Sequence, residues 1–218
     1  MSEVIIVKTV KPTLVTDEGT RSFISLGKYL NARLLPLDDP SLPHDWYPLF
    51  VSYQRELKVQ EELEANGFET FLPMESKTSK QGHKIVHSME PAIHNLIFVK
   101  SYYERIRWMK MYNKVCTSIQ FMSFEGHSPR ETVIPPVQMT HFINACKKAE
   151  GNEYSIFLRP DEIAQYKGKQ VKFVKGVFEG IEGYIQRVNK NRMVIVTLKD
   201  LISIALPVSC RDELAFIQ

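Results

Sequence analysis

Cations gathered around a glycine turn are the residues of this 218-residue chain that are best suited to bind another molecule. Lys77, Lys80 and Lys84 flank Gly82 in the segment KTSKQGHKIVH, which has the pattern of a projecting hairpin. Such a hairpin could touch DNA phosphates, and three lysines would give a weak contact that added salt weakens further. The alternative is a solvated loop whose charges only keep the protein soluble.

A second basic cluster lies further along the chain. Arg105, Arg107 and Lys110 surround Trp108, and two tyrosines precede them. Aromatic rings among cations can stack on nucleic-acid bases. A helix that buries the tryptophan and exposes the arginines explains the same pattern, and this is the arrangement that we expect.

No pattern in the sequence predicts catalysis or a cofactor. His83, His87 and His94 follow one another at spacings of four and seven residues, which do not place a pair on one helix here, so no metal site is expected. The chain has no phosphate-binding glycine loop, no nucleophile elbow and no paired carboxylates in a glycine-rich setting.

The composition is that of a globular protein with one domain or two small ones, since 24% of its residues are charged and 44% are hydrophobic. Cys116, Cys146 and Cys210 lie far apart, which fits a reducing compartment. The apolar run at the start is too short for a signal peptide, and no stretch approaches the length of a membrane span. We therefore expect a cytoplasmic protein.

Alternating strands and helices must position these residues. Residues 46–52 are strand-like, although Pro48 predicts an edge or irregular pairing. Residues 55–66 have a helical pattern that Gly67 ends. Further strands are predicted at 68–74 and 95–100.

The following region continues the alternation. A helix is predicted at 103–111 and a strand at 119–124, and Pro135-Pro136 open a helix that runs to about residue 149, because proline suits the first helical turn. This order predicts a small α+β sandwich with helices against an antiparallel sheet. Residues 152–165 are polar and form a predicted linker.

Glycines mark tight bends in the C-terminal part. Gly176, Gly180 and Gly183 stand among alternating apolar residues, before the strand-like run at 191–198. Because glycine reaches positive φ without steric cost, this spacing predicts a short, strongly bent antiparallel barrel. The segment from residue 166 onward is also basic.

The order of these motifs resembles the NusG family of transcription elongation factors. Trp46-Tyr47 open the first strand, a charged helix ends in a glycine, and Leu72-Pro73 close the next strand, as in that family. The segment at 171–185 resembles the KOW motif, an SH3-like barrel of transcription and translation factors. The similarity covers roughly residues 46–218.

The resemblance implies an α+β fold, in which a ferredoxin-like α/β sandwich is followed by a small SH3-like β-barrel. It divides the chain into an N-terminal extension at 1–44, with a short helix at Ser22–Leu30, a polymerase-binding domain at 45–151, a linker at 152–165 and a KOW domain at 166–218.

Two departures from the family pattern point to a specialised member. Ile93-His94-Asn95-Leu96 stand where general NusG proteins carry a Phe-Pro-x-Tyr turn, and residues 1–44 are additional. Both features resemble paralogues of the UpxY type, which act on capsular polysaccharide operons.

In this family the N-terminal module grips the clamp helices of RNA polymerase through an apolar pocket. Carried over to this chain, the pocket would consist of Tyr47, Phe50, Leu96 and Phe98. A few buried anchors of this kind supply most of the energy of an interface. The alternative is that these side chains belong to the core, because half of the residues in a strand face inward.

The resemblance also implies two further contact regions. Lys77, Lys80 and Lys84 would contact nontemplate DNA or the polymerase lobe opposite the clamp. Phe178, Glu179 and Ile181, which we expect to be exposed, would bind a ribosomal protein or the termination factor Rho through the KOW domain.

The function implied is that of a non-enzymatic, operon-specific transcription elongation or antitermination factor, with no cofactor and no membrane partner. One alternative is the housekeeping NusG-type elongation factor. Another is an RNA- or ribosome-binding assembly protein with the same barrel, and a third is an enzyme with a barrel appendage.

Overall fold

A computed structural model describes most of the chain beyond the N-terminal extension. The predicted helix Ser22–Leu30 lies outside the described residues, and the side chains of Lys80, Gln81 and Lys84 are also not described. The described residues are 38–52, 54–81, 84–122, 132–159, 168–199 and 201–217.

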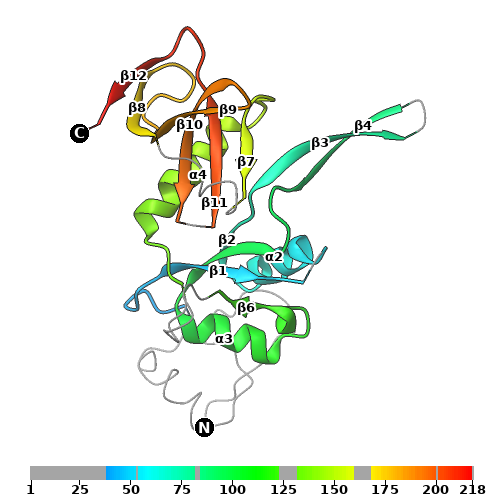
Figure 1. The fold of residues 1–218 in the computed structure, drawn as a ribbon. Coiled ribbons are helices and arrows are strands. Elements are labelled where there is room, and N and C mark those ends of the chain that lie inside the picture. Colours follow the sequence, from blue (N-terminus) through cyan, green and yellow to red (C-terminus); the bar gives the residue numbers. More distant parts are fainter. Residues whose placement is uncertain are drawn as a thin grey trace, which may run out of the picture. The chain divides into compact units, whose positions relative to one another are not determined.

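The chain forms two compact units, and each one combines separate stretches of sequence (Figure 1). Unit 1 comprises Met1–Leu72 and His94–Val133, and unit 2 comprises Pro73–Ile93 and Ile134–Gln218. The elements described give a mixed α/β structure with several sheets and few helices.

Unit 1 is built on an antiparallel four-stranded sheet. The order of the strands is β2-β5-β1-β6, so β5 and β1 occupy its centre. These strands are β1 (Asp45–Phe50), β2 (Glu69–Phe71), β5 (Leu96–Ser101) and β6 (Gln120–Phe121).

Pro48 was predicted to lie at an edge or in an irregular pairing. The edge was wrong, because β1 lies between β5 and β6, but the ladder to β6 stops before Pro48. The carbonyl of Pro48 accepts a hydrogen bond from the N–H of Met122, at 3.3 Å. In a strand, the N–H and C=O of one residue point to the same neighbour, so the missing N–H of Pro48 faces β6. Because the ladder to β6 contains only Leu49 and Phe50, the proline disrupts no ladder bond there.

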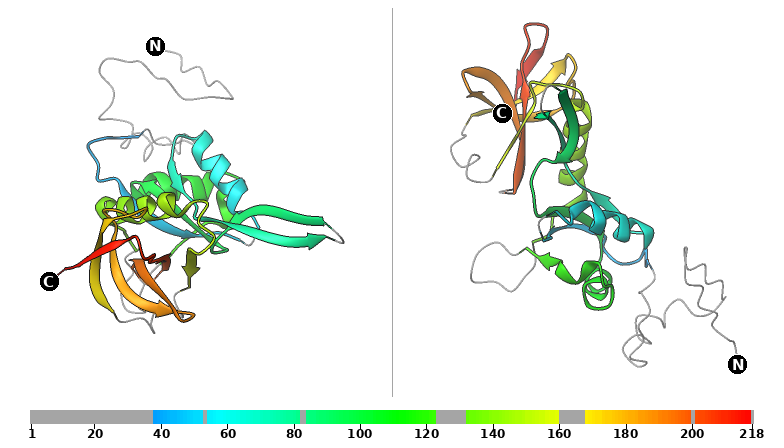
Figure 2. Two further views of the ribbon diagram at one scale, coloured as in Figure 1. Left: turned by 90° about the horizontal axis from the view of Figure 1, so that it is seen from above. Right: turned by 90° about the vertical axis from the view of Figure 1, so that its right-hand side faces the viewer.

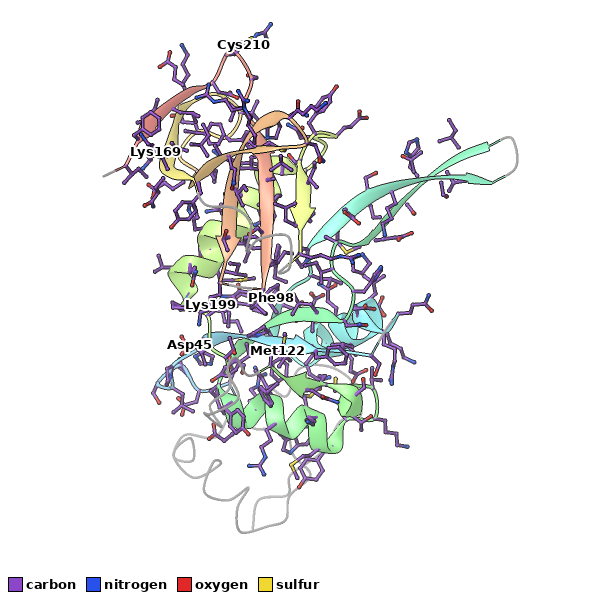
Figure 3. All side chains as sticks on the ribbon, in the orientation of Figure 1. Asp45, Phe98, Met122, Lys169, Lys199 and Cys210 are labelled. Carbon is purple, nitrogen blue, oxygen red and sulfur yellow. The ribbon has the colours of Figure 1, made fainter. Side chains whose placement is uncertain are left out.

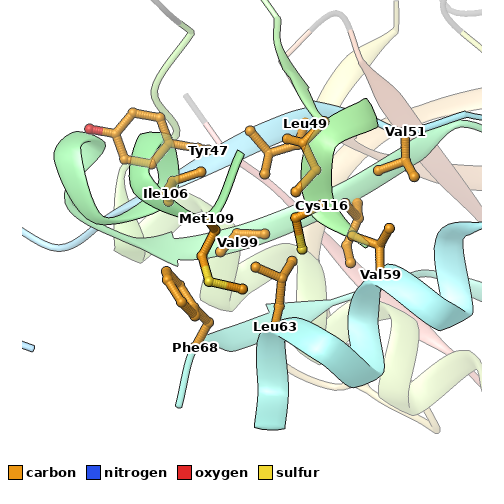
Figure 4. Packing of buried hydrophobic residues seen from close by; sticks show 12 residues of the cluster. Tyr47, Leu49, Val51, Val59, Leu63, Phe68, Val99, Ile106, Met109 and Cys116 are labelled. Carbon is orange, nitrogen blue, oxygen red and sulfur yellow. The ribbon is translucent and has the colours of Figure 1, made fainter. Parts of the chain in front are cut away.

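Two α-helices pack on one face of this sheet, α2 (Glu56–Ala65) and α3 (Tyr103–Tyr112), with the 3-10 helix η1 (Cys116–Ser118) beside them. Figure 4 shows Leu63 and Met109 from the helices meeting Leu49 and Val99 from the strands. After α2 the chain turns through Gly67, whose φ of 77° suits glycine, as the sequence predicts.

Arg105 of α3 is buried, although the sequence predicts exposed arginines on this helix. Its guanidinium donates to the carbonyl of Asn66 at 3.0 Å and lies 4.1 Å from the centre of the Phe68 ring. Asp38 accepts a further bond, at 3.3 Å. These partners compensate the burial, which lowers the pKa of Arg105. Arg107 is exposed, as expected.

In unit 2, β3 (Met74–Gln81) and β4 (Lys84–Pro91) form a long two-stranded ribbon (Figures 1 and 2). This hairpin is the one that the sequence predicts around Gly82. Its register pairs Lys77 with Ser88 and Thr78 with His87.

The remainder of unit 2 is a six-stranded antiparallel sheet with one helix, α4 (Pro136–Ala149). The order of the strands is β12-β8-β9-β10-β11-β7. They are β7 (Ile156–Leu158), β8 (Lys169–Lys175), β9 (Glu182–Val188), β10 (Asn191–Leu198), β11 (Ile202–Pro207) and β12 (Glu213–Phe216).

The helix α4 lies against β10 and β11. His141 donates through Nε2 to the carbonyl of Glu182, at 2.9 Å, and Lys148 donates to the carbonyl of Glu179. Part of the predicted linker is also a strand here, because β7 pairs with β11. The structure therefore groups α4 and β7 with the six-stranded sheet.

Burial is nearly continuous along β10, which explains its unbroken apolar sequence. Met193 and Ile195 belong to a cluster with Ala205 and Leu158, while Val194 and Val196 are buried on the other face. A strand covered on both faces does not show the alternation of a half-exposed one.

Two of the three cysteines are buried, and the third, Cys210, is exposed. Burial raises the pKa of the Cys116 and Cys146 thiols to about 12, so these thiols stay protonated and unreactive at neutral pH. Within the described ranges, no helix is long and apolar enough to cross a membrane.

Candidate protein-binding site

The register of β1 and β5 gathers apolar side chains on the sheet face that neither α2 nor α3 covers. Pro48 lies opposite Phe98, and Phe50 lies opposite Leu96. Directly opposed residues in an antiparallel pair point to the same side, and the next residues along each strand point to the other side. We call this surface the apolar face, formed by Trp46, Pro48, Phe50, Phe71, Leu96 and Phe98.

Ring contacts and one ion pair organise this face. The rings of Phe71 and Phe98 lie 6.4 Å apart between their centres, and Phe98 is labelled in Figure 3. Lys100 forms an ion pair with Glu69 at 2.8 Å and lies 6.0 Å from the Trp46 ring. An aromatic centre with a charged margin is the usual composition of a protein interface.

The predicted pocket residues differ in their accessibility. Phe50 is 40% exposed, whereas Leu96 and Phe98 are buried. A partner can therefore contact Phe50 directly in this structure. It would reach Leu96 and Phe98 only after the atoms that cover them move.

The structure does not bring Tyr47 to the apolar face. Its ring packs edge-on against Phe121, with 5.9 Å between the ring centres, within the core that α2 and α3 cover. Tyr47 and Phe50 are three positions apart in one strand, so their side chains point to opposite faces.

A buried carboxylate, which sequence reasoning missed, supports one end of the apolar face. Glu56 is 2% exposed and accepts a hydrogen bond from the backbone N–H of Asn95, at 2.7 Å. Asn95 has a φ of 67°, and its carbonyl accepts the N–H of Val51. Glu56 thus holds the turn that places Leu96 opposite Phe50. An acidic residue in the first turn of a helix was the available signal.

The β3–β4 ribbon has two different faces. On one face Lys77 lies 3.1 Å from Glu90 and 3.6 Å from Glu75, and its hydrogen bond to Glu90 raises the lysine pKa. The opposite face exposes Ile85 and Met89 beside His87, which bonds to Thr78 at 3.1 Å. Of the three predicted lysines, Lys77 is paired, and the side chains of Lys80 and Lys84 lie outside the described part.

Phe178 and Ile181 are buried, so the expectation that they are exposed was wrong. The turn folds back on β8, because the N–H of Gly180 donates to the carbonyl of Phe173 at 2.7 Å. The rings of Phe173 and Phe178 then pack 5.5 Å apart. Glu179 is exposed, as expected, and so is its neighbour Val177.

The described part of the chain contains no candidate metal site, because no cluster of His, Cys, Asp or Glu in it is arranged to hold a metal ion. The same part contains three candidate regions for binding, which are the apolar face, the two-faced ribbon and the compact C-terminal sheet. On the apolar face Phe50 is exposed and Phe71 is half-buried, while the other four side chains, Trp46, Pro48, Leu96 and Phe98, are buried.

Comparison with known proteins identifies the first of these regions. Residues 44–143 match the model of the NusG family, described as transcription termination factor nusG. The match covers a little under half of the chain and includes every residue of the apolar face. This part of the chain is therefore similar to the NusG family. No curated protein matches the sequence.

Proposed function

We propose that this protein is a transcription elongation and antitermination factor that binds RNA polymerase through the apolar face. The observation that carries this proposal is that the NusG-family match at 44–143 contains that whole face, including the exposed Phe50. An apolar sheet face with a few aromatic anchors suits the tip of a helical coiled coil, such as the clamp helices.

The proposed mechanism is binding alone. The apolar face would hold the clamp, while the β3–β4 ribbon would reach the polymerase lobe or the nontemplate strand. A factor that binds the closed-clamp state more tightly shifts the polymerase toward that state and so opposes pausing and termination. No bond is made or broken, which agrees with a non-enzymatic protein.

Specialisation for particular operons, of the capsular polysaccharide type, is part of the proposal. It is supported by the turn that leads into β5, where Ile93-His94-Asn95-Leu96 replace the family's Phe-Pro-x-Tyr pattern. Here the Asn95 N–H is held by Glu56. The six-stranded sheet would act as the KOW domain, presenting Val177 and Glu179 rather than Phe178 and Ile181 to a ribosomal protein or Rho.

The test is a charge placed at Phe50, the exposed residue at one end of the apolar face. Phe50→Glu should raise the Kd for core RNA polymerase by about thirtyfold or more, the effect of losing an anchor worth about 2 kcal/mol. Leu57→Glu is the matched control, because Leu57 is similarly exposed on α2, outside the apolar face. Both variants should keep the far-UV spectrum of the parent protein. Equal binding by Phe50→Glu and the parent would refute the assignment.

A further inference from the structure

Three cationic side chains lie close together at the tip of the β9–β10 hairpin. Arg187 and Arg192 are directly opposed across the two strands, and Lys190 lies in the two-residue loop between them. All three side chains are exposed. Like charges placed directly opposite each other destabilise a strand pair. The opposed arginines therefore destabilise the hairpin, and no described contact within the hairpin compensates for this.

The loop itself adds a second cost. Asn189 and Lys190 both have positive φ values, 50° and 68°, as a type I′ turn requires. Asparagine tolerates this conformation and glycine favours it, but a lysine is strained there. The lysine thus adds a third positive charge at a position where glycine would fit better.

Among the described residues, no acidic side chain forms an ion pair with Arg187, Lys190 or Arg192. The lysines of the adjacent β8 are different. Lys172 pairs with Glu182 at 3.0 Å, and Lys175 pairs with Glu213 at 3.8 Å.

The pairing of the neighbouring strands ends near this tip. The pairing of β8 with β9 reaches Ile185, two positions before Arg187. On the other side, the pairing of β11 with β10 reaches Met193, and the N–H of Val208 still donates to the carbonyl of Arg192 at 3.0 Å. The three cationic side chains remain exposed, so a ligand can reach them.

We propose that this hairpin tip, formed by Arg187, Lys190 and Arg192, binds the phosphodiester backbone of a nucleic acid. Bound phosphates would neutralise the opposed arginines, and the guanidinium fork matches phosphate oxygens. The remaining exposed side chains of the tip are Asn189 and Asn191, which are polar. An acidic protein partner is less suitable, since the buried core of a protein interface is rich in apolar and aromatic side chains, and the exposed side chains of this tip are all polar or charged.

The test uses the full-length chain without polymerase, so it is independent of the proposed clamp contact. Fluorescein-labelled RNA, single-stranded DNA and duplex DNA are titrated over a series of KCl concentrations, with anisotropy as the readout. The triple variant Arg187→Gln, Lys190→Gln, Arg192→Gln should bind roughly tenfold more weakly at low salt. Its salt slope on single strands should fall by about 2, at about 0.7 per lost phosphate contact.

The matched control removes the same number of charges from β8, as Lys169→Gln, Lys172→Gln, Lys175→Gln. Lys169 lies over the Phe216 ring at 5.6 Å and the other two are ion-paired, so the control should lose less than threefold in affinity, roughly one phosphate contact. The nucleic acid with the largest loss in the hairpin variant identifies the ligand. The proposal would be overturned if both variants lost affinity equally or if the hairpin variant lost none. It would also be overturned if polyglutamate displaced the labelled nucleic acid as well as unlabelled nucleic acid does.

Discussion

Glu56 shows how one side chain shapes the apolar face from a distance. Its carboxylate is nearly inaccessible, lies at the start of α2 and receives the Asn95 N–H. His94 Nδ1 is 3.9 Å from the same oxygen. Without the carboxylate, the turn at Asn95 would have an unsatisfied N–H next to the Phe50–Leu96 pair.

Replacing Glu56 by alanine should lower the free energy of unfolding by about 1–3 kcal/mol, because a buried donor would lose its acceptor. Urea denaturation measures this change. Glu61→Ala is the control, since Glu61 is an exposed residue of the same helix and should change stability by less than about 0.5 kcal/mol. Equal losses in the two variants would mean that Glu56 acts only through helix propensity.

For single residues, the sequence predicted which kinds of side chain form the candidate site better than it predicted which of them lie together. Leu96 and Phe98, two positions apart, were expected together and do share a face. Tyr47 was grouped with Phe50 although an odd spacing separates them, so the alternation of a strand already excluded it. The exposure of Phe178 was predicted wrongly for another reason. An apolar residue in a turn becomes buried only when the loop folds back on a strand, as it does here. The periodicity of the sequence does not indicate such a fold-back.

Among the elements, the β9–β10 hairpin has a turn sequence that is not the one most favourable for its conformation. Asn-Gly is the favoured pair in a type I′ turn, and this chain has Asn189-Lys190 instead. A residue that costs stability at an exposed tip is explained more readily by binding than by folding.

Lys190→Gly should therefore raise the free energy of unfolding by about 0.5–1 kcal/mol, since glycine relieves the positive φ. The same variant should bind nucleic acid more weakly, having lost one cation. Thermal or urea denaturation and the anisotropy assay measure the two effects. Asn189→Gly is the control and should change both quantities less, because asparagine tolerates this conformation. A Lys190→Gly protein that is less stable would show that the loop is not strained.

Most elements were predictable because their signals are local. The expected helices at 55–66, 103–111 and 136–149 correspond to α2, α3 and α4, and the strand expected at 191–198 is β10. Short strands were the main omission. The three residues of β7 have no readable period, and this strand exists through its pairing with β11.

In the molecule as a whole, each compact unit is built from separate stretches of the sequence. The NusG-family match is continuous over 44–143, yet it includes the β3–β4 ribbon and the start of α4, which belong to unit 2. A linear pattern could predict the succession of elements, but not that α4 packs on β10 and β11. That contact joins residues that are distant in sequence, so local sequence patterns cannot predict it.

The central claim, that the apolar face contacts the polymerase clamp, is tested most directly by crosslinking on a transcribing complex. A photoreactive benzoyl-phenylalanine in place of Phe50 keeps the aromatic ring and reports its neighbours. If the apolar face binds the clamp, this group forms an adduct with the clamp helices, and the same group at Leu57 forms none. Adducts of equal yield from both positions, or none with polymerase from position 50, would contradict the claim.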